Sequence, residues 1–154
     1  MKVLIFSTGN SCRSQMAQGY LQSFDPYLRV YSAGTKIEIP MNENAVRVMS
    51  LKGIDISQQS QNCIDKYLNE EWDYVVTLCE EARKSSPTFL GKVKQRVDFD
   101  FDDLSCIEGT EAFVESEYIR VRDDIGEQLY RFLIVEVKGS ESCPCGANSF
   151  CKCE

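Results

Sequence analysis

The sequence predicts a single α/β domain with a central parallel four-stranded sheet and helices on both faces, followed by a cysteine-rich tail. Short apolar segments alternate with amphipathic helical segments, as in parallel sheets whose strands are joined by helices. The length of 154 residues suits one domain. After Gly139 the apolar periodicity ends, so we divide the chain into a domain over residues 1–139 and a tail over residues 140–154.

Four short segments have the character of buried strands. The first is an apolar, β-branched segment, the third is the most continuously apolar, and the fourth alternates apolar with polar residues. The predicted strands are Lys2–Phe6, Leu28–Ala33, Asp73–Leu78 and Val93–Phe101.

Five segments place apolar residues at helical spacing or connect these strands. Asp25-Pro26 ends the first helix and Gly53 follows the second. The predicted helices are Gln15–Phe24, Asn42–Leu51, Gln61–Leu68, Glu80–Lys84 and Glu111–Lys138. The apolar face of the last helix contains Phe113, Tyr118, Val121, Ile125, Leu129 and Phe132.

Composition excludes several classes of function. With 17 Lys and Arg against 24 Asp and Glu, the net charge is −7, which disfavours nucleic-acid and anionic-membrane partners. Histidine is absent, which excludes Ser–His and Cys–His catalysis and His-liganded zinc. The apolar run at residues 3–6 is too short for a signal peptide, so we expect a cytoplasmic protein with reduced thiols.

The predicted topology selects a site before any motif is considered. In a parallel sheet the binding crevice lies beyond the carboxyl ends of the strands. The loops that follow Phe6, Leu78 and Phe101 should therefore meet. The candidate residues are Ser7–Ser14, Cys79 and the pair Asp102 and Asp103.

The segment Ser7-Thr-Gly-Asn-Ser-Cys-Arg-Ser14 is typical of an oxyanion-binding loop. A strand that enters a helix through a short loop directs backbone N–H groups and the helix dipole towards one point. Arg13 adds a guanidinium that matches a tetrahedral oxyanion, and Gly9 and Asn10 suit positive φ. The expected oxyanion-binding residues are Thr8, Gly9, Asn10, Ser11, Cys12, Arg13 and Ser14. The alternative is an ordinary turn with an exposed arginine.

This loop resembles the phosphate loop of low-molecular-weight protein tyrosine phosphatases and, more closely, of the thioredoxin-coupled arsenate reductases with the same fold. The similarity continues through Tyr31–Gly34, Gly53–Ser57, Val75–Cys79, Phe101–Asp103 and Val121–Asp124. It implies arsenate or phosphate as the ligand, no required cofactor, and thioredoxin or another thiol as reductant. It also implies that Ser14 hydrogen-bonds residue 7.

The chain differs from this family at the residue that performs the nucleophilic attack. The family's nucleophilic cysteine falls on Ser7, and a hydroxyl needs a neighbouring base that a histidine-free chain does not supply in the usual form. Ser7 should therefore bind an oxyanion without attacking it. Cys12 is expected to be a packing residue rather than a substitute nucleophile.

The family's three-cysteine relay is also incomplete. Cys79 matches the second relay cysteine, but the third position is Ser86. Two interpretations of Cys79 stay open, a relay thiol and an inert buried thiol. Asp103 falls on the family's general acid, with Asp102 as its neighbour, and the alternative is a solvated acidic loop.

The tail contains two Cys-x-Cys pairs. Thiolates at this spacing can converge on a soft metal ion or on trivalent arsenic, and the alternatives are a disordered, reduced tail or a pair of disulfides without function. A further hypothesis is that the tail carries resolving thiols to Cys79. The candidate ligands are Cys143, Cys145, Cys151 and Cys153.

Three whole-protein hypotheses follow from these residues. The first is an arsenate reductase whose natural residue 7 is cysteine and has been replaced by serine in this chain. The second is a natural pseudo-enzyme that binds oxyanions, arsenic or soft metals without turnover. The third is a low-molecular-weight tyrosine phosphatase.

Overall fold

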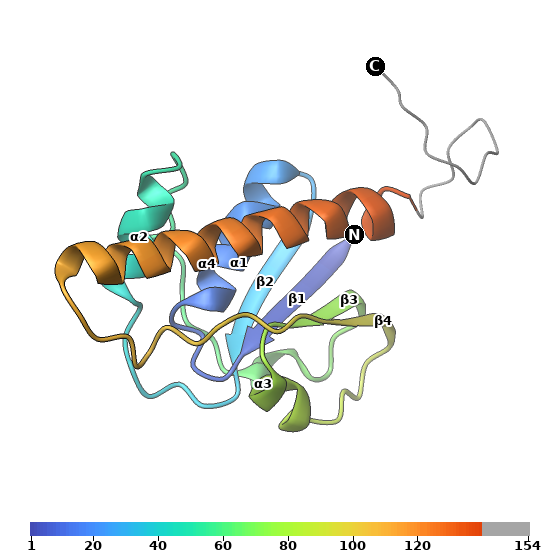
Figure 1. Ribbon diagram of the computed structural model, residues 1–154. Helices are drawn as coiled ribbons and strands as arrows, with labels where there is room; N and C mark the ends of the chain where they lie inside the picture. The colour runs from blue at the N-terminus through green and yellow to red at the C-terminus, as the bar shows by residue number, and fades with distance from the viewer. Residues whose placement is uncertain (140–154) are drawn as a thin grey trace, which may run out of the picture.

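The computed structural model describes residues 1–139 and contains one parallel four-stranded sheet in the order β2-β1-β3-β4 (Figure 1). The strands are β1 (Lys2–Ser7), β2 (Arg29–Gly34), β3 (Trp72–Thr77) and β4 (Val93–Asp98). The helices are α1 (Arg13–Phe24), α2 (Glu43–Ser50), α3 (Glu80–Lys84) and α4 (Glu111–Phe132). A 3-10 helix covers Ile64–Tyr67, and a π-helix over Leu133–Val137 continues α4. The predicted fold class is confirmed.

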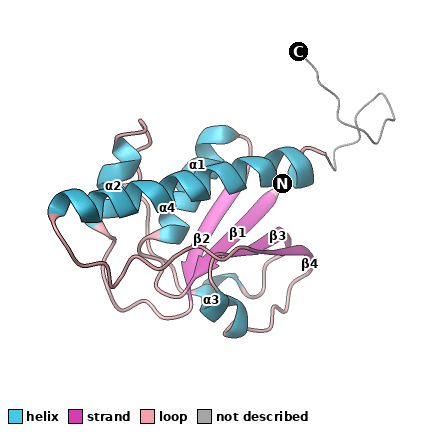
Figure 2. Ribbon diagram, viewed as in Figure 1, coloured by secondary structure: helices cyan, strands magenta, loops and turns pink. Residues whose placement is uncertain are grey.

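Helices cover both faces of the sheet because its central strands are apolar on both sides (Figure 2). Side chains alternate along a strand, so Val3 and Ile5 of β1 pack in the core shared with α1, α2 and α4. Leu4 and Phe6 point the other way and pack with residues of the 3-10 helix and α3. This double burial fixes where β1 ends, and therefore where the loop after it lies.

The predicted helix over Gln61–Leu68 is wrong except for its centre. Asn62 uses its backbone for other bonds: its carbonyl accepts from Gly34 N–H at 2.8 Å, and its N–H donates to Asn10 Oδ1 at 2.8 Å. A backbone bound to β2 and to the loop after β1 is not available for helical hydrogen bonds, which leaves only Ile64–Tyr67.

Three smaller expectations also differ. β4 ends at Asp98 rather than Phe101, since the chain leaves the sheet where the Phe101 carbonyl accepts from Arg13 Nη1 at 2.8 Å. Helix α1 begins two residues earlier than predicted, at Arg13. Phe113 is half exposed, because it lies in the first turn of α4, ahead of the buried face that begins with Tyr118.

No helix within residues 1–139 is both long and apolar enough to cross a bilayer. The predicted tail over residues 140–154, with its four cysteines, lies outside the described residues.

Gly34 allows β2 to approach the loop that follows β1. A Cβ at this position would lie 2.8 Å from Thr8 O and 3.0 Å from Asn10 N, and both neighbours are backbone atoms that cannot rotate away. Only glycine fits such a close approach. The loop therefore depends on the residue that ends the neighbouring strand.

We expect Gly34→Ala to lower the free energy of unfolding by about 2 kcal/mol, because overpacking forces backbone shifts. Gly9→Ala is the matched control, since its Cβ would meet only Ser11 Oγ at an ordinary 3.5 Å. Chemical denaturation of both variants checks this. Equal stability of the two variants would contradict the close-approach argument.

Candidate active site

The loop between β1 and α1 forms one wall of a cavity of about 320 Å³. Residues 7–13 line it on one side, and residues from the segment after β4 close it on another. The predicted meeting of the loops after Phe6 and Phe101 is confirmed. The remaining lining residues are Ile39, Asn42, Glu81, Asp103, Leu104, Ser105 and Tyr118.

Asn10 determines the shape of this loop. Its φ is 51°, in the left-handed region that asparagine tolerates better than most residues. The side chain is fully buried, with Nδ2 donating to Ser14 Oγ at 2.9 Å and Oδ1 accepting from Asn62 N–H at 2.8 Å. Positive φ was predicted for both Gly9 and Asn10, and only Asn10 adopts it. The Asn10 side chain is thus committed to holding the loop.

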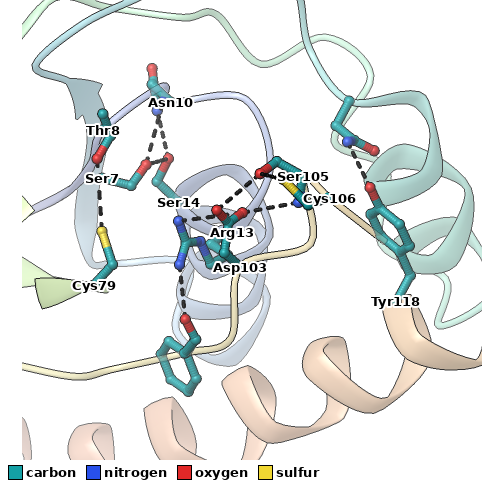
Figure 3. Close-up of polar contacts among 12 residues, drawn as sticks. Ser7, Thr8, Asn10, Arg13, Ser14, Cys79, Asp103, Ser105, Cys106 and Tyr118 are labelled. Carbon is teal, nitrogen blue, oxygen red and sulfur yellow. Dashed lines mark hydrogen bonds and ion pairs between the residues drawn. The ribbon is translucent and has the colours of Figure 1, made fainter. Parts of the chain in front are cut away.

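Ser7 lines the cavity, is almost completely buried and lies beside Ser14 (Figure 3). Its hydroxyl donates to Ser14 Oγ at 2.9 Å and accepts from Asn10 N–H at 3.3 Å, which confirms the predicted contact with Ser14. Among the described residues, these partners include no carboxylate or amine that could act as a base. The arrangement fixes the Ser7 oxygen without activating it as a nucleophile.

Arg13 begins α1 and lines the cavity, with its side chain only 14% exposed. Nη1 donates to Phe101 O at 2.8 Å, and Nη2 lies 4.0 Å from Asp103 Oδ1. The guanidinium is therefore held at the mouth of the loop. The first turn of α1 adds backbone N–H groups without intrahelical acceptors. Together these donors can hold a tetrahedral oxyanion.

Of the two candidate carboxylates, only Asp103 lines the cavity. Asp102 instead pairs with Arg120 at 3.0 Å. Partial burial raises the pKa of Asp103, but hydrogen bonds from Ser105 and the Arg13 charge outweigh this and hold the pKa below its usual range. Asp103 is therefore ionised at neutral pH, and a further negative charge beside it would be needed to raise its pKa enough for proton donation.

The two cysteines near the loop differ in environment. Burial raises the pKa of Cys12 to about 12, against smaller opposing effects of Arg13, so this thiol stays protonated at neutral pH. Cys79 follows β3, and its Sγ lies 3.9 Å from Thr8 Oγ1 (Figure 3). The structure thus brings Cys79 beside the loop and leaves Cys12 without thiolate character.

Sequence reasoning missed two residues that hold the loop in place. Asn42 N–H donates to Ser11 O at 2.8 Å, and its side chain donates to Tyr118 Oη at 2.9 Å while it caps α2. Gln15 is buried and donates to Asn10 O at 2.9 Å. The helix cap at Asn42 could have been predicted from its position before a helix. The long-range hydrogen bonds of Asn42 and Gln15 cannot be predicted from the local sequence.

Within residues 1–139, no three His, Cys, Asp or Glu side chains gather in a way that could hold a metal ion. The cysteines predicted as soft-metal ligands all fall in the tail, so that hypothesis stays a prediction. The described site offers an anion cradle, one arginine, one carboxylate and a neighbouring thiol.

Alkylation separates the described thiols. At pH 8, iodoacetamide should label the exposed Cys63 and Cys106 and leave Cys12 unlabelled, because a pKa of about 12 keeps the Cys12 thiol protonated. Peptide mapping by mass spectrometry measures the labelling. Rapid modification of Cys12 in the folded protein would contradict the assigned environment.

Comparison with known proteins identifies the family and the fold. A model of the low molecular weight phosphotyrosine protein phosphatase family matches residues 2–140. The chain is 42% identical to an arsenate reductase of Bacillus licheniformis over 131 residues, covering 84% of this chain and 93% of the relative. It is also 42% identical to an arsenate reductase of Bacillus subtilis over 134 residues, covering 85% and 94%.

Solved structures agree with this assignment. A structure described as an arsenate reductase in the phosphate binding state superposes with a TM-score of 0.71 at 26% identity, covering 86% of this chain and 96% of that one. Vibrio vulnificus Wzb in complex with benzylphosphonate shares the fold, with a TM-score of 0.67 at 16% identity over 85% and 95% of the two chains. The chain belongs to the low molecular weight phosphotyrosine protein phosphatase family, with arsenate reductases among its curated relatives.

Proposed function

We propose that this protein is arsenate reductase-like and that its loop over residues 7–14 binds arsenate or phosphate. The observation that carries the proposal is the loop itself, which is held by the hydrogen bond between Asn10 and Ser14 and lines one cavity together with Arg13. The relatives named arsenate reductase supply the substrate class. In this proposal the anion's oxygens accept from the loop amides and from Arg13, and Asp103 lies beside them.

Residue 7 decides which reaction the cradle supports. A thiol in this position would lose its proton readily, since backbone amides, a helix N-terminus and an arginine stabilise negative charge. The Ser7 hydroxyl has a far higher pKa and no base beside it, so it forms no covalent bond to arsenic or phosphorus. We assign Ser7 to anion binding, and we expect thioredoxin or a similar dithiol as reductant wherever a cysteine reaction occurs.

A second candidate function is an oxyanion-binding pseudo-enzyme. It is favoured by the Ser7 hydroxyl, which completes the hydrogen bonds of the loop without becoming a nucleophile. Binding of arsenate with no reduction under any thiol condition would select this candidate. A tyrosine phosphatase remains the third candidate, and the residue 7 variant described below tests it.

The anion site is tested by Arg13→Lys. We expect phosphate and arsenate to bind the unchanged chain, and the variant to bind them at least about tenfold more weakly, because lysine loses the bidentate fork. Isothermal titration calorimetry at pH 7.5 measures both affinities. Arg120→Lys is the charge-matched control, since Arg120 pairs with Asp102 and Glu117 and does not line the cavity. Equal affinities for the two variants would refute the assignment.

The role of residue 7 is tested by Ser7→Cys. We expect arsenate reduction with thioredoxin at least about 100-fold faster than in the unchanged chain, because a cradle-stabilised thiolate replaces an unactivated hydroxyl. Ser116→Cys is the control, since it adds an exposed thiol on α4 instead. Arsenite production and aryl phosphate hydrolysis are both measured. Hydrolysis of the aryl phosphate without arsenite production would favour the phosphatase. If the variant shows neither activity, the proposal is refuted.

A further inference from the structure

The cavity beside the anion-binding loop contains carboxylates as well as hydrogen-bond donors. Among the described residues that line it, Arg13 is the one cationic side chain, whereas Glu81 and Asp103 both end in carboxylates. Two negative charges therefore oppose a single positive charge in the cavity wall. A site that attracts oxyanions by charge alone gains nothing from carboxylates at this distance. Recognition in this cavity thus depends on something besides charge.

Asp103 is held in a defined orientation beside Arg13 (Figure 3). The Ser105 N–H donates to Asp103 Oδ1 at 2.9 Å, and Ser105 Oγ donates to Oδ2 at 2.9 Å. Arg13 Nη2 lies 4.0 Å from Oδ1. A carboxylate has about four acceptor positions, so each oxygen keeps room for a further donor. An oxyanion bound by Arg13 and the loop amides therefore has one oxygen beside an ionised carboxylate.

Oxyanions of the same shape differ in whether they carry a proton. At pH 8, hydrogen arsenate, hydrogen phosphate and sulfate are all tetrahedral dianions, so neither shape nor charge separates them. Hydrogen arsenate and hydrogen phosphate keep one O–H group, whereas sulfate has none. An O–H group donates a short, charge-assisted hydrogen bond to a carboxylate. A bare oxygen in the same place brings two negative charges together, which is unfavourable.

We propose that Asp103 selects oxyanions that carry a proton. Its carboxylate accepts a hydrogen bond from the O–H group of hydrogen arsenate or hydrogen phosphate, and it repels sulfate. This inference rests on the proposed function and adds the selectivity of the same site. Glu81 lines the cavity from α3, but Asp103 is the carboxylate that lies 4.0 Å from Arg13, so we assign the contact to Asp103. The Asp103 side chain is 63% exposed, so water competes for it and keeps the discrimination moderate.

Selection by Asp103 makes sulfate binding depend on pH. A bound dianion without a proton raises the pKa of a carboxylate beside it, so sulfate binds best when Asp103 is protonated. Sulfate affinity should then rise as the pH falls from 8 to 5, a range in which sulfate itself does not titrate. The other titratable groups that face the cavity are Cys12, Arg13, Glu81 and Tyr118. Glu81 is the other carboxylate among them, so it supplies a control variant.

Isothermal titration calorimetry on the full chain at pH 8 compares phosphate, arsenate and sulfate. We expect the unchanged protein to bind sulfate about tenfold more weakly than phosphate. Asp103→Asn should reduce this ratio to less than about threefold, because an amide also donates to sulfate. Glu81→Gln should keep the ratio, and so should Asp102→Asn, since Asp102 pairs with Arg120 and does not line the cavity.

A pH series with sulfate gives a second readout. The rise in sulfate affinity between pH 8 and pH 5 should persist in Glu81→Gln and disappear in Asp103→Asn, because only the second variant removes the carboxylate beside Arg13. Thermal unfolding checks that both variants keep the fold. The affinity ratio and the pH series of the unchanged chain test the inference even where a variant does not fold.

The outcomes distinguish this inference from the proposed function. If neither phosphate nor arsenate binds, the proposed function itself is defeated. Equal affinities for phosphate and sulfate in the unchanged chain would leave the anion site standing and overturn the selection. A ratio that Asp103→Asn leaves intact, or one that Glu81→Gln abolishes, would overturn the assignment to Asp103. A sulfate affinity that stays constant from pH 8 to pH 5 would overturn it as well.

Discussion

The site depends on the buried side chain of Asn10 and on the left-handed backbone that it stabilises. Its amide bridges Ser14 on α1 and Asn62 in a segment more than fifty residues later, so one residue ties the loop to two parts of the fold. The φ of 51° reverses the chain between β1 and α1. The Asn10 side chain is fully buried, so the loop is held from within the fold. Gly34 and Gln15 support the same turn from outside.

Electrostatics explain why an acidic protein can carry an anion site. The net charge of −7 opposes anion approach over most of the surface. The local balance differs, because Arg13 is largely buried and the first turn of α1 contributes its dipole, both at short range. Asp103 works against them as long as it is ionised, and its lowered pKa keeps it so in the empty site. Any anion affinity must therefore come from this one loop and not from the overall charge of the protein.

Local sequence patterns predicted most of the fold and the position of the site. The four strands, the helix after the anion loop and the contact between Ser7 and Ser14 all follow from short-range signals or from family resemblance. The errors occur where distant contacts override local preference. Asn62 bonds to Asn10 and to Gly34 instead of joining a helix, and Asn10 rather than Gly9 has the positive φ. Asn42 and Tyr118, far apart in sequence, meet only in the folded chain.

Oxygen at residue 7 suits the loop to binding an oxyanion, whereas sulfur suits it to nucleophilic attack. A thiolate attacks but carries a negative charge that repels the incoming oxyanion, whereas a neutral hydroxyl attacks poorly and adds no repulsion. The Ser7 hydroxyl also both donates and accepts, so it satisfies Ser14 and the Asn10 amide at once. The serine thus favours holding the anion over reacting with it. Of the described thiols outside the loop, Cys79 is the one placed beside it, with its Sγ 3.9 Å from Thr8 Oγ1.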